Sequence, residues 1–151
     1  MDSETRALFE SRLLTLAQAR VRERRLADAT HTGSAKNPFC GDEIAVDLRL
    51  NADGGLEALG YEAKACSLCV ASAELLSRWL EDMQASAGSV AGSVAPETLH
   101  ALAQSVDLAL KGEKEPAGFE ALATVRPFRA RHKCVTLPFD AVTKALKDQH
   151  S

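Results

Sequence analysis

The feature that most constrains the fold is a short segment, residues 43–50, in which apolar and polar side chains alternate. Its apolar members are Ile44, Val46, Leu48 and Leu50, and charged side chains fill most of the positions between them. Successive side chains of a β-strand point to opposite faces of the sheet, so this period of two predicts a strand with one buried face. A buried face requires a second layer packed against it.

The strand leads into a predicted hairpin. Residues 51–55 read Asn-Ala-Asp-Gly-Gly, and Asp-Gly and Gly-Gly pairs supply the positive φ that tight hairpin turns require. The returning strand, over 56–65, alternates less regularly, and a bulge at Gly60 would explain the change of phase. Residues 29–35 are small and polar, and they are consistent with either an edge strand or a loop.

Apolar residues at helical spacing predict helices on both sides of the hairpin. The expected helices cover residues 1–28, 67–85 and 96–110, one or two turns over 119–125, and a last helix from about residue 130. Four arginines between positions 20 and 25 suit the negative end of the first helix dipole. They are interpreted either as a solvated helix end or as a patch on which a partner docks.

These elements predict a single α+β domain over residues 1–151, with a small three-stranded antiparallel sheet and helices packed on one of its faces. Residues 86–96 are rich in glycine, serine and alanine, and we expect a mobile loop there. Pro138 falls inside the last helix, where proline marks a boundary or a kink.

Composition and charge exclude several classes of function. The net charge is −3, from 18 basic and 21 acidic residues, so a nucleic-acid partner receives no general electrostatic support. No apolar run approaches the roughly 20 residues that span a bilayer, so no membrane association is expected. The first residues lack a secretory pattern, which predicts a cytoplasmic protein with reduced cysteines. Four cysteines in that setting favour metal or thiol chemistry over disulfides, although scattered core cysteines are the simpler interpretation.

Three candidate site residues flank the hairpin. Cys40 and Asp42 lie directly before its first strand, and Cys66 directly follows its second. An antiparallel hairpin brings its open ends together, so these side chains are expected to be neighbours. If Cys66 begins the next helix, the helix dipole would lower the pKa of its thiol. Cys66 and Cys69 also form a Cys-x-x-Cys pair, which is open to three interpretations: a redox pair, half of a zinc site, or a core cysteine one turn after Cys66.

Three motifs, taken in order, resemble those of the U-type iron–sulfur scaffold family, which comprises IscU, SufU and the N-terminal domain of NifU. The motifs are Asn37-Pro38-Phe39-Cys40-Gly41-Asp42, Ala65-Cys66-Ser67-Leu68-Cys69-Val70-Ala71-Ser72 and Arg131-His132-Lys133-Cys134-Val135-Thr136-Leu137. The resemblance covers residue 37 to the C-terminus. Lys133 before the third motif cysteine, the long separation of Cys66 and Cys134, and the lack of a Leu-Pro-Pro-Val-Lys segment are similar to the SufU branch.

The resemblance implies a set of four residues that bind one metal ion. These residues are Cys40, Asp42, Cys66 and Cys134. The ion would be Zn²⁺, or alternatively iron or a [2Fe–2S] cluster at the same site, because three thiolates suit both. His132 is a further candidate for a ligand, although a solvated side chain is the simpler interpretation. Lys133 would lower the pKa of the Cys134 thiol if it pointed inward.

The resemblance also implies work with a cysteine desulfurase and with downstream iron–sulfur assembly proteins. In one interpretation the protein is a zinc-dependent acceptor and carrier of persulfide sulfur, a sulfurtransferase partner rather than a stand-alone enzyme. In the other it is a scaffold on which a [2Fe–2S] cluster is assembled and handed on. Cys40, on a flexible turn, is the expected sulfur acceptor, and Cys134 is the alternative. A structural zinc domain, or a degenerate family member without sulfur traffic, is the third interpretation, and an exchangeable Asp42 ligand argues against it.

Overall fold

The computed structural model describes residues 1–86 and 93–148. The elements run in the order α1 (Ser3–Ala19), β1 (His31–Lys36), β2 (Glu43–Leu50), β3 (Leu56–Lys64), α2 (Ser67–Ala85), α3 (Pro96–Leu110), the 3₁₀ helices η1 (Glu120–Val125) and η2 (Arg129–Arg131), and α4 (His132–Asp148). In this part of the chain no helix is long and apolar enough to cross a membrane.

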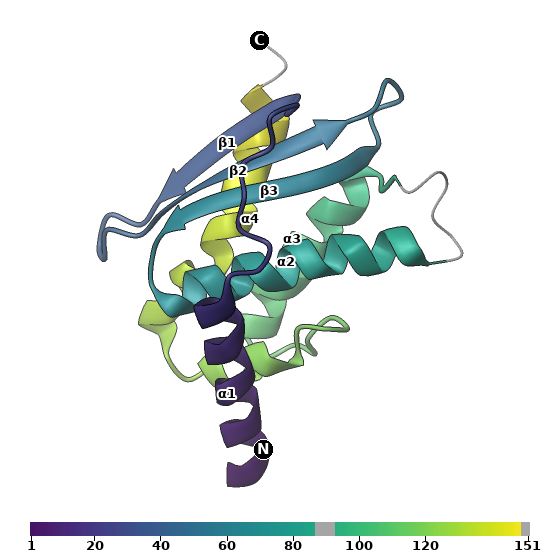
Figure 1. The fold of residues 1–151 in the computed structure, drawn as a ribbon. Helices are drawn as coiled ribbons and strands as arrows, with labels where there is room; N and C mark the ends of the chain where they lie inside the picture. Colours follow the sequence, from purple (N-terminus) through teal and green to yellow (C-terminus); the bar gives the residue numbers. More distant parts are fainter. Residues whose placement is uncertain (87–92, 149–151) are drawn as a thin grey trace.

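The strands form one antiparallel sheet in the order β1-β2-β3, and helices pack on one face of it, so the expected α+β fold is confirmed. On the covered face, Val46 of β2 lies opposite Gly33 of β1 and Tyr61 of β3. α4 runs beneath β1 and β2, and α2 runs beneath β3 (Figure 1). Residues 29–35, left open between strand and loop, contribute to the edge strand β1.

The predicted bulge at Gly60 is wrong. The register shift between β2 and β3 lies between Arg49 and Leu50, next to the hairpin turn. Gly60 is required for another reason, because a Cβ at this position would lie under 3.0 Å from the carbonyl oxygen of Arg24. The chain between α1 and β1 crosses the sheet at this point (Figure 1), and the missing side chain leaves room for it.

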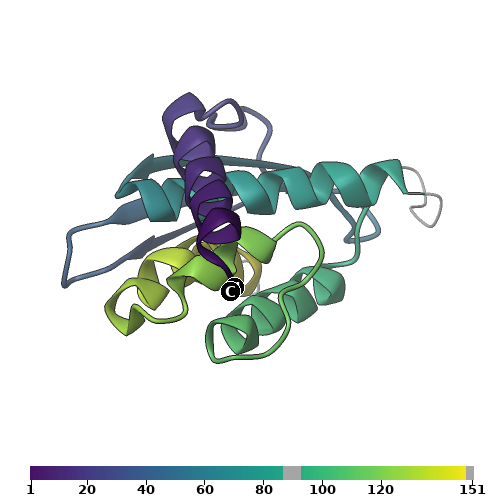
Figure 2. The same ribbon diagram turned by 90° about the horizontal axis from the view of Figure 1, so that it is seen from below.

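The first helix is shorter than predicted: α1 ends at Ala19 and does not continue to residue 28. Asp2 caps its N-terminus by accepting a hydrogen bond from the Thr5 N–H. At the other end Arg20 adopts a left-handed conformation, with φ 48°, and turns the chain back over the sheet. α1 lies across α2 in both ribbon views (Figures 1 and 2).

Three of the four arginines from positions 20–25 make ion pairs that fix this crossing segment, so they are neither a solvated helix end nor a free patch. The guanidinium of Arg22 donates a hydrogen bond to the carboxylate of Glu74, a fully buried residue of α2. The same carboxylate accepts a hydrogen bond from the hydroxyl of Tyr61, at 2.7 Å. Arg25 makes two hydrogen bonds to Asp47, a residue of β2 that is only 2% exposed. The crossing segment is therefore part of the folded core.

The Arg25–Asp47 pair predicts a loss of stability in acid. The hydrogen bonds from Arg25 hold the pKa of the Asp47 carboxyl below its usual range, so the pair stabilises the fold above the unfolded pKa of about 4. This contribution should disappear as the pH falls through the folded pKa. Asp47→Asn should lower the free energy of unfolding by roughly 1–3 kcal/mol at pH 7. In urea titrations from pH 7 to pH 3, its stability should fall less steeply than that of the wild type; an equal slope would contradict the prediction.

α4 packs against β1 without a side chain between the two backbones. A Cβ on Gly33 would lie under 3.0 Å from the Ala141 carbonyl oxygen and from the backbone of Ala145. Gly33→Ala should therefore force the helix off the sheet and cost about 1–3 kcal/mol, as overpacking does. The measurement is urea unfolding, with the exposed neighbour Ser34→Ala as control. An equal effect of both substitutions would show that the contact is not tight.

The remaining helices agree closely with the sequence-based predictions. α2 and α3 begin and end at the predicted residues, and η1 supplies the short turns near residue 120. Pro138 lies within α4 and does not mark a boundary. The loop predicted over 86–96 falls partly on residues 87–92, which lie outside the described residues, and beyond them Val94 pairs with Leu56 in an isolated β-bridge.

Candidate metal centre

The loop between β1 and β2 presents Cys40 to solvent. Asn37, only 3% exposed, organises this loop: its N–H donates to the Asp42 carbonyl at 2.8 Å, and its carbonyl accepts from the Gly41 N–H at 2.9 Å. Its side-chain oxygen also accepts from the Phe39 N–H, at 3.1 Å. Gly41 has φ +76°, a conformation that glycine adopts without strain. The tight turn therefore leaves both Phe39 and Cys40 exposed, with Phe39 at 97%.

Asp42 is the buried acid of the site, at 5% exposed. Its Oδ1 accepts a hydrogen bond from the backbone N–H of Cys66, at 3.0 Å. Its Oδ2 is buried and has no hydrogen-bond partner among the described residues. A buried carboxylate oxygen without a partner is costly, and a bound cation is the kind of ligand that would satisfy it. The carboxylate thus ties the two ends of the hairpin together and keeps one buried oxygen without a hydrogen-bond partner among the described residues.

Cys134 reaches the same point from the first turn of α4. The Sγ atoms of Cys40 and Cys134 and a carboxylate oxygen of Asp42 all lie within 4.8 Å of one another. In a tetrahedral zinc site with Zn–S bonds of about 2.3 Å, ligand atoms lie roughly 4 Å apart. The three groups therefore need only a small contraction to share one ion, and they fit a metal such as zinc.

Cys66 lies beside this group. It is the N-cap residue of α2, as expected, and its backbone N–H is bonded to Asp42, but the residue is exposed and its thiol is not one of the ligand atoms that lie within 4.8 Å of one another. The expected lowering of its pKa is wrong: although the residue is exposed, partial desolvation of its thiol raises the pKa of Cys66, and the nearby carboxylate adds to the effect. Burial also raises the pKa of the Cys134 thiol. In the metal-free protein both thiols therefore favour the protonated form.

Three further residues from the motifs lie outside the site. Cys69 is 0% exposed and packs in the core, which supports the interpretation as a core cysteine over a redox pair or a second zinc half-site. Lys133 pairs with Asp140 on the surface of α4, so it does not point inward. The Nε2 of His132 lies 3.0 Å from the carbonyl oxygen of Arg126, and His132 is not part of the metal-binding group.

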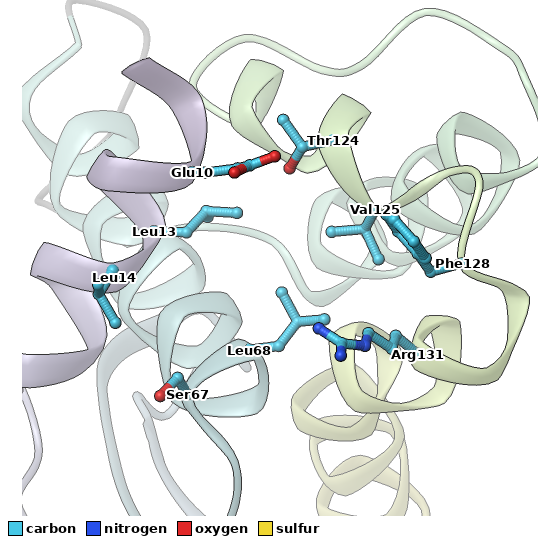
Figure 3. Close-up of a pocket in the computed structure, with 9 residues that line it drawn as sticks. All are labelled: Glu10, Leu13, Leu14, Ser67, Leu68, Thr124, Val125, Phe128 and Arg131. Carbon is cyan, nitrogen blue, oxygen red and sulfur yellow. The ribbon is translucent and has the colours of Figure 1, made fainter. Parts of the chain in front are cut away.

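A pocket of about 380 Å³ borders the start of α2, next in sequence to Cys66 (Figure 3). Its walls come from α1, α2, η1 and η2 and are mainly apolar. The lining residues are Glu10, Leu13, Leu14, Ser67, Leu68, Thr124, Val125, Phe128 and Arg131. Leu14 and Phe128 are about half exposed, and the charged residues Glu10 and Arg131 are exposed at the pocket as well.

The motif order, the sheet topology and the clustered thiols agree with a family match. The family model for the NifU-like N-terminal domain matches residues 19–149. The chain belongs to this family. The match extends before the first cysteine motif, so it includes the segment that crosses the sheet.

Curated relatives of this NifU-like domain have two kinds of name. This chain is 28% identical over 125 residues to the iron–sulfur cluster assembly scaffold protein IscU of Streptococcus pyogenes, and the match covers 80% of this chain and 71% of the relative. It is 28% identical over 112 residues to the zinc-dependent sulfurtransferase SufU of Bacillus subtilis, covering 73% and 70%. The similarity to both does not distinguish the two branches.

Solved structures share the fold. The N-terminal part of a NifU-like protein from Brucella abortus superposes with a TM-score of 0.76 at 24% identity, covering 92% of each chain. A putative scaffold protein for the SUF system from Fervidobacterium islandicum gives a TM-score of 0.71 at 16% identity, covering 90% of this chain and 94% of the other.

The role of Asn37 in shaping the cysteine loop was not predicted from sequence. The Asn37-Pro38 pair was a usable signal, because asparagine before proline favours a turn. Ser72 is a second missed residue: its hydroxyl donates to the carbonyl oxygen of Val135 at 2.6 Å and joins α2 to α4. No local pattern could have indicated that bond, because the two residues are far apart in sequence.

Proposed function

We propose that this protein acts in cytoplasmic iron–sulfur cluster biogenesis as a zinc-dependent acceptor and carrier of persulfide sulfur, which it receives from a cysteine desulfurase. One observation carries the proposal: the side chains of Cys40, Asp42 and Cys134 lie close together, and Asp42 has a buried carboxylate oxygen without a hydrogen-bond partner among the described residues. The names of the IscU and SufU relatives support this area of function. All four cysteines are free thiols, as a reducing compartment requires.

Four side chains would hold the ion. They are Cys40, Asp42, Cys66 and Cys134. Bound zinc would keep the thiols deprotonated although burial raises the pKa of the Cys66 and Cys134 thiols, and it would satisfy the free oxygen of Asp42. A carboxylate ligand exchanges more readily than a fourth thiolate, so this donor set suits a site that opens during its work.

Cys40 is the proposed sulfur acceptor. It is exposed on a loop, whereas Cys134 is 7% exposed within a helix; Cys66 is exposed as well, but its backbone is held by a hydrogen bond to Asp42 at the start of α2. In the transfer, the Cys40 sulfur attacks the outer sulfur of the partner's persulfide, R–S–SH. Cys40 enters as the thiolate, the S–S bond of the partner breaks as a new one forms on Cys40, and the departing thiolate R–S⁻ takes a proton from water. The products are R–SH and a Cys40 persulfide, so no external oxidant or reductant is required.

Assembly of a [2Fe–2S] cluster on the same thiols is the second candidate. Cysteine thiolates are the usual ligands of such clusters, and two matched relatives carry the name of an IscU scaffold. Lys133, directly before Cys134, is similar to the SufU branch and favours sulfur transfer. The cluster would be a cargo of the protein, bound and then handed to downstream assembly proteins.

The test is elemental analysis of anaerobically purified protein, followed by incubation with a cysteine desulfurase and cysteine. Sulfur transfer predicts tightly bound zinc, increased desulfurase turnover and a persulfide on Cys40, detected by mass spectrometry after alkylation. Cys40→Ser should lose the persulfide, and the core control Cys69→Ala should retain it. A lasting visible absorption from a [2Fe–2S] cluster, without zinc, would favour the scaffold. Absence of zinc, of transferable sulfur and of a cluster would refute both candidates.

A further inference from the structure

Pro138 stands four residues after Cys134, in the interior of α4. In an α-helix the N–H of each residue bonds the carbonyl oxygen four positions earlier, so residue 138 is the expected donor to the Cys134 carbonyl. Proline has no N–H, and its ring clashes with that same carbonyl. Both effects of this proline therefore fall on the backbone of a residue whose thiol belongs to the candidate metal centre.

The two halves of α4 are anchored to different parts of the molecule. Beyond the proline, the helix backbone at Ala141 and Ala145 packs directly on Gly33 of the sheet. Before it, the Val135 carbonyl accepts the hydrogen bond from Ser72 of α2, and both residues are fully buried. α2 is the helix that begins at Cys66. The turn that carries Cys134 is thus tied to the helix that carries its neighbouring cysteine.

We propose that Pro138 is a positioning residue for the Cys134 thiol. The Cys134 carbonyl receives no helical hydrogen bond from residue 138. The orientation of the first turn of α4 is therefore set by its packing on α2 and not by the half of α4 that packs on the sheet. That orientation fixes how far the Cys134 sulfur lies from Cys40 and Asp42. The inference rests on the proposed function only in taking Cys134 as a metal ligand.

The experiment compares Pro138→Ala with the wild type, using Co²⁺ as a spectroscopic probe and Zn²⁺ competition against a chelator. The new amide at position 138 should bond the Cys134 carbonyl and be protected from hydrogen exchange. The thiolate-to-cobalt charge-transfer bands should shift or weaken, and zinc affinity should fall about tenfold or more, as when groups that orient metal ligands are replaced. Thermal stability should not fall, because a helical hydrogen bond is gained.

Pro96→Ala is the matched control. Pro96 also lies in a helix, but at the first position of α3, where the N–H has no acceptor within the helix. This variant should leave the cobalt spectrum and the zinc affinity unchanged. A loss of affinity in Pro138→Ala alone therefore reports the bond to Cys134 and not a general effect of removing a proline.

A folded Pro138→Ala with wild-type cobalt bands and zinc affinity would overturn the inference. If that variant does not fold, Ser72→Ala decides instead: it releases the first turn from α2, and unchanged bands would equally overturn it. A wild type that binds neither ion refutes the metal centre but not the positioning role. In that case the rate of Cys40–Cys134 disulfide formation with diamide measures the same distance, and an equal rate in both proteins refutes the positioning role.

Discussion

Replacing Asp42 by Asn is expected to shift the stabilities of the metal-free and metal-bound proteins in opposite directions. Asn keeps an oxygen that can accept the Cys66 N–H, so the hairpin ends stay joined. The free Oδ2, buried and without a hydrogen-bond partner, is replaced by a neutral amide group. Removing the unsatisfied charge should raise the stability of the metal-free protein by about 1 kcal/mol. Loss of an anionic ligand should lower zinc affinity at least roughly a hundredfold, about 2.8 kcal/mol.

The measurement is urea unfolding with excess chelator and with excess zinc, together with zinc competition. Glu43→Gln is a suitable control, because this neighbouring carboxylate forms a surface ion pair with Lys36 and should change either stability by less than about 1 kcal/mol. A metal-free Asp42→Asn protein that is less stable than the wild type would show that the carboxylate serves the fold. Unchanged zinc affinity would remove Asp42 from the ligand set.

Local periodicity was sufficient for most of the fold. The alternation over 43–50 and the glycine turn determine the hairpin, and the helical spacing over 67–85 determines α2, because each pattern lies within a single element. The path of the chain between α1 and β1 could not be predicted in this way. It depends on pairings between distant residues, such as Arg22 with Glu74 and Arg25 with Asp47. The Gly60 error has the same origin, because the glycine accommodates a crossing chain and not a local bulge.

The same distinction between local patterns and contacts of distant residues applies to the candidate site. The hairpin alone indicated that Cys40, Asp42 and Cys66 would be neighbours; the structure brings the side chains of Cys40 and Asp42 together and joins Cys66 to Asp42 through its backbone N–H. The addition of Cys134 depended on the family resemblance, because no periodicity connects α4 to the loop. The direction of the Cys66 pKa shift was wrong because helix-end electrostatics can be estimated from sequence, whereas desolvation of the thiol and its distance from the Asp42 carboxylate cannot.

Removal of the Glu74 carboxylate is expected to cause a large loss of stability without a direct effect on the metal centre. Glu74 is fully buried, and three groups donate hydrogen bonds to it: the Tyr61 hydroxyl, the Arg22 backbone N–H and the Arg22 guanidinium. Glu74→Ala leaves the Tyr61 hydroxyl without its acceptor and Arg22 without its buried partner. Breaking a buried ionic pair on one side costs about 3–5 kcal/mol.

The exposed end of the same network supplies the control. Arg22 also pairs with Glu81, whose side chain is 56% exposed, and Glu81→Ala should cost no more than about 1 kcal/mol. Urea unfolding of both variants measures the difference, and Glu74→Gln separates the loss of charge from the loss of volume. If Glu74→Ala costs no more than Glu81→Ala, the crossing segment is not held by this carboxylate. If the large difference is found, the segment between α1 and β1 is fixed mainly from α2, the helix that begins at Cys66.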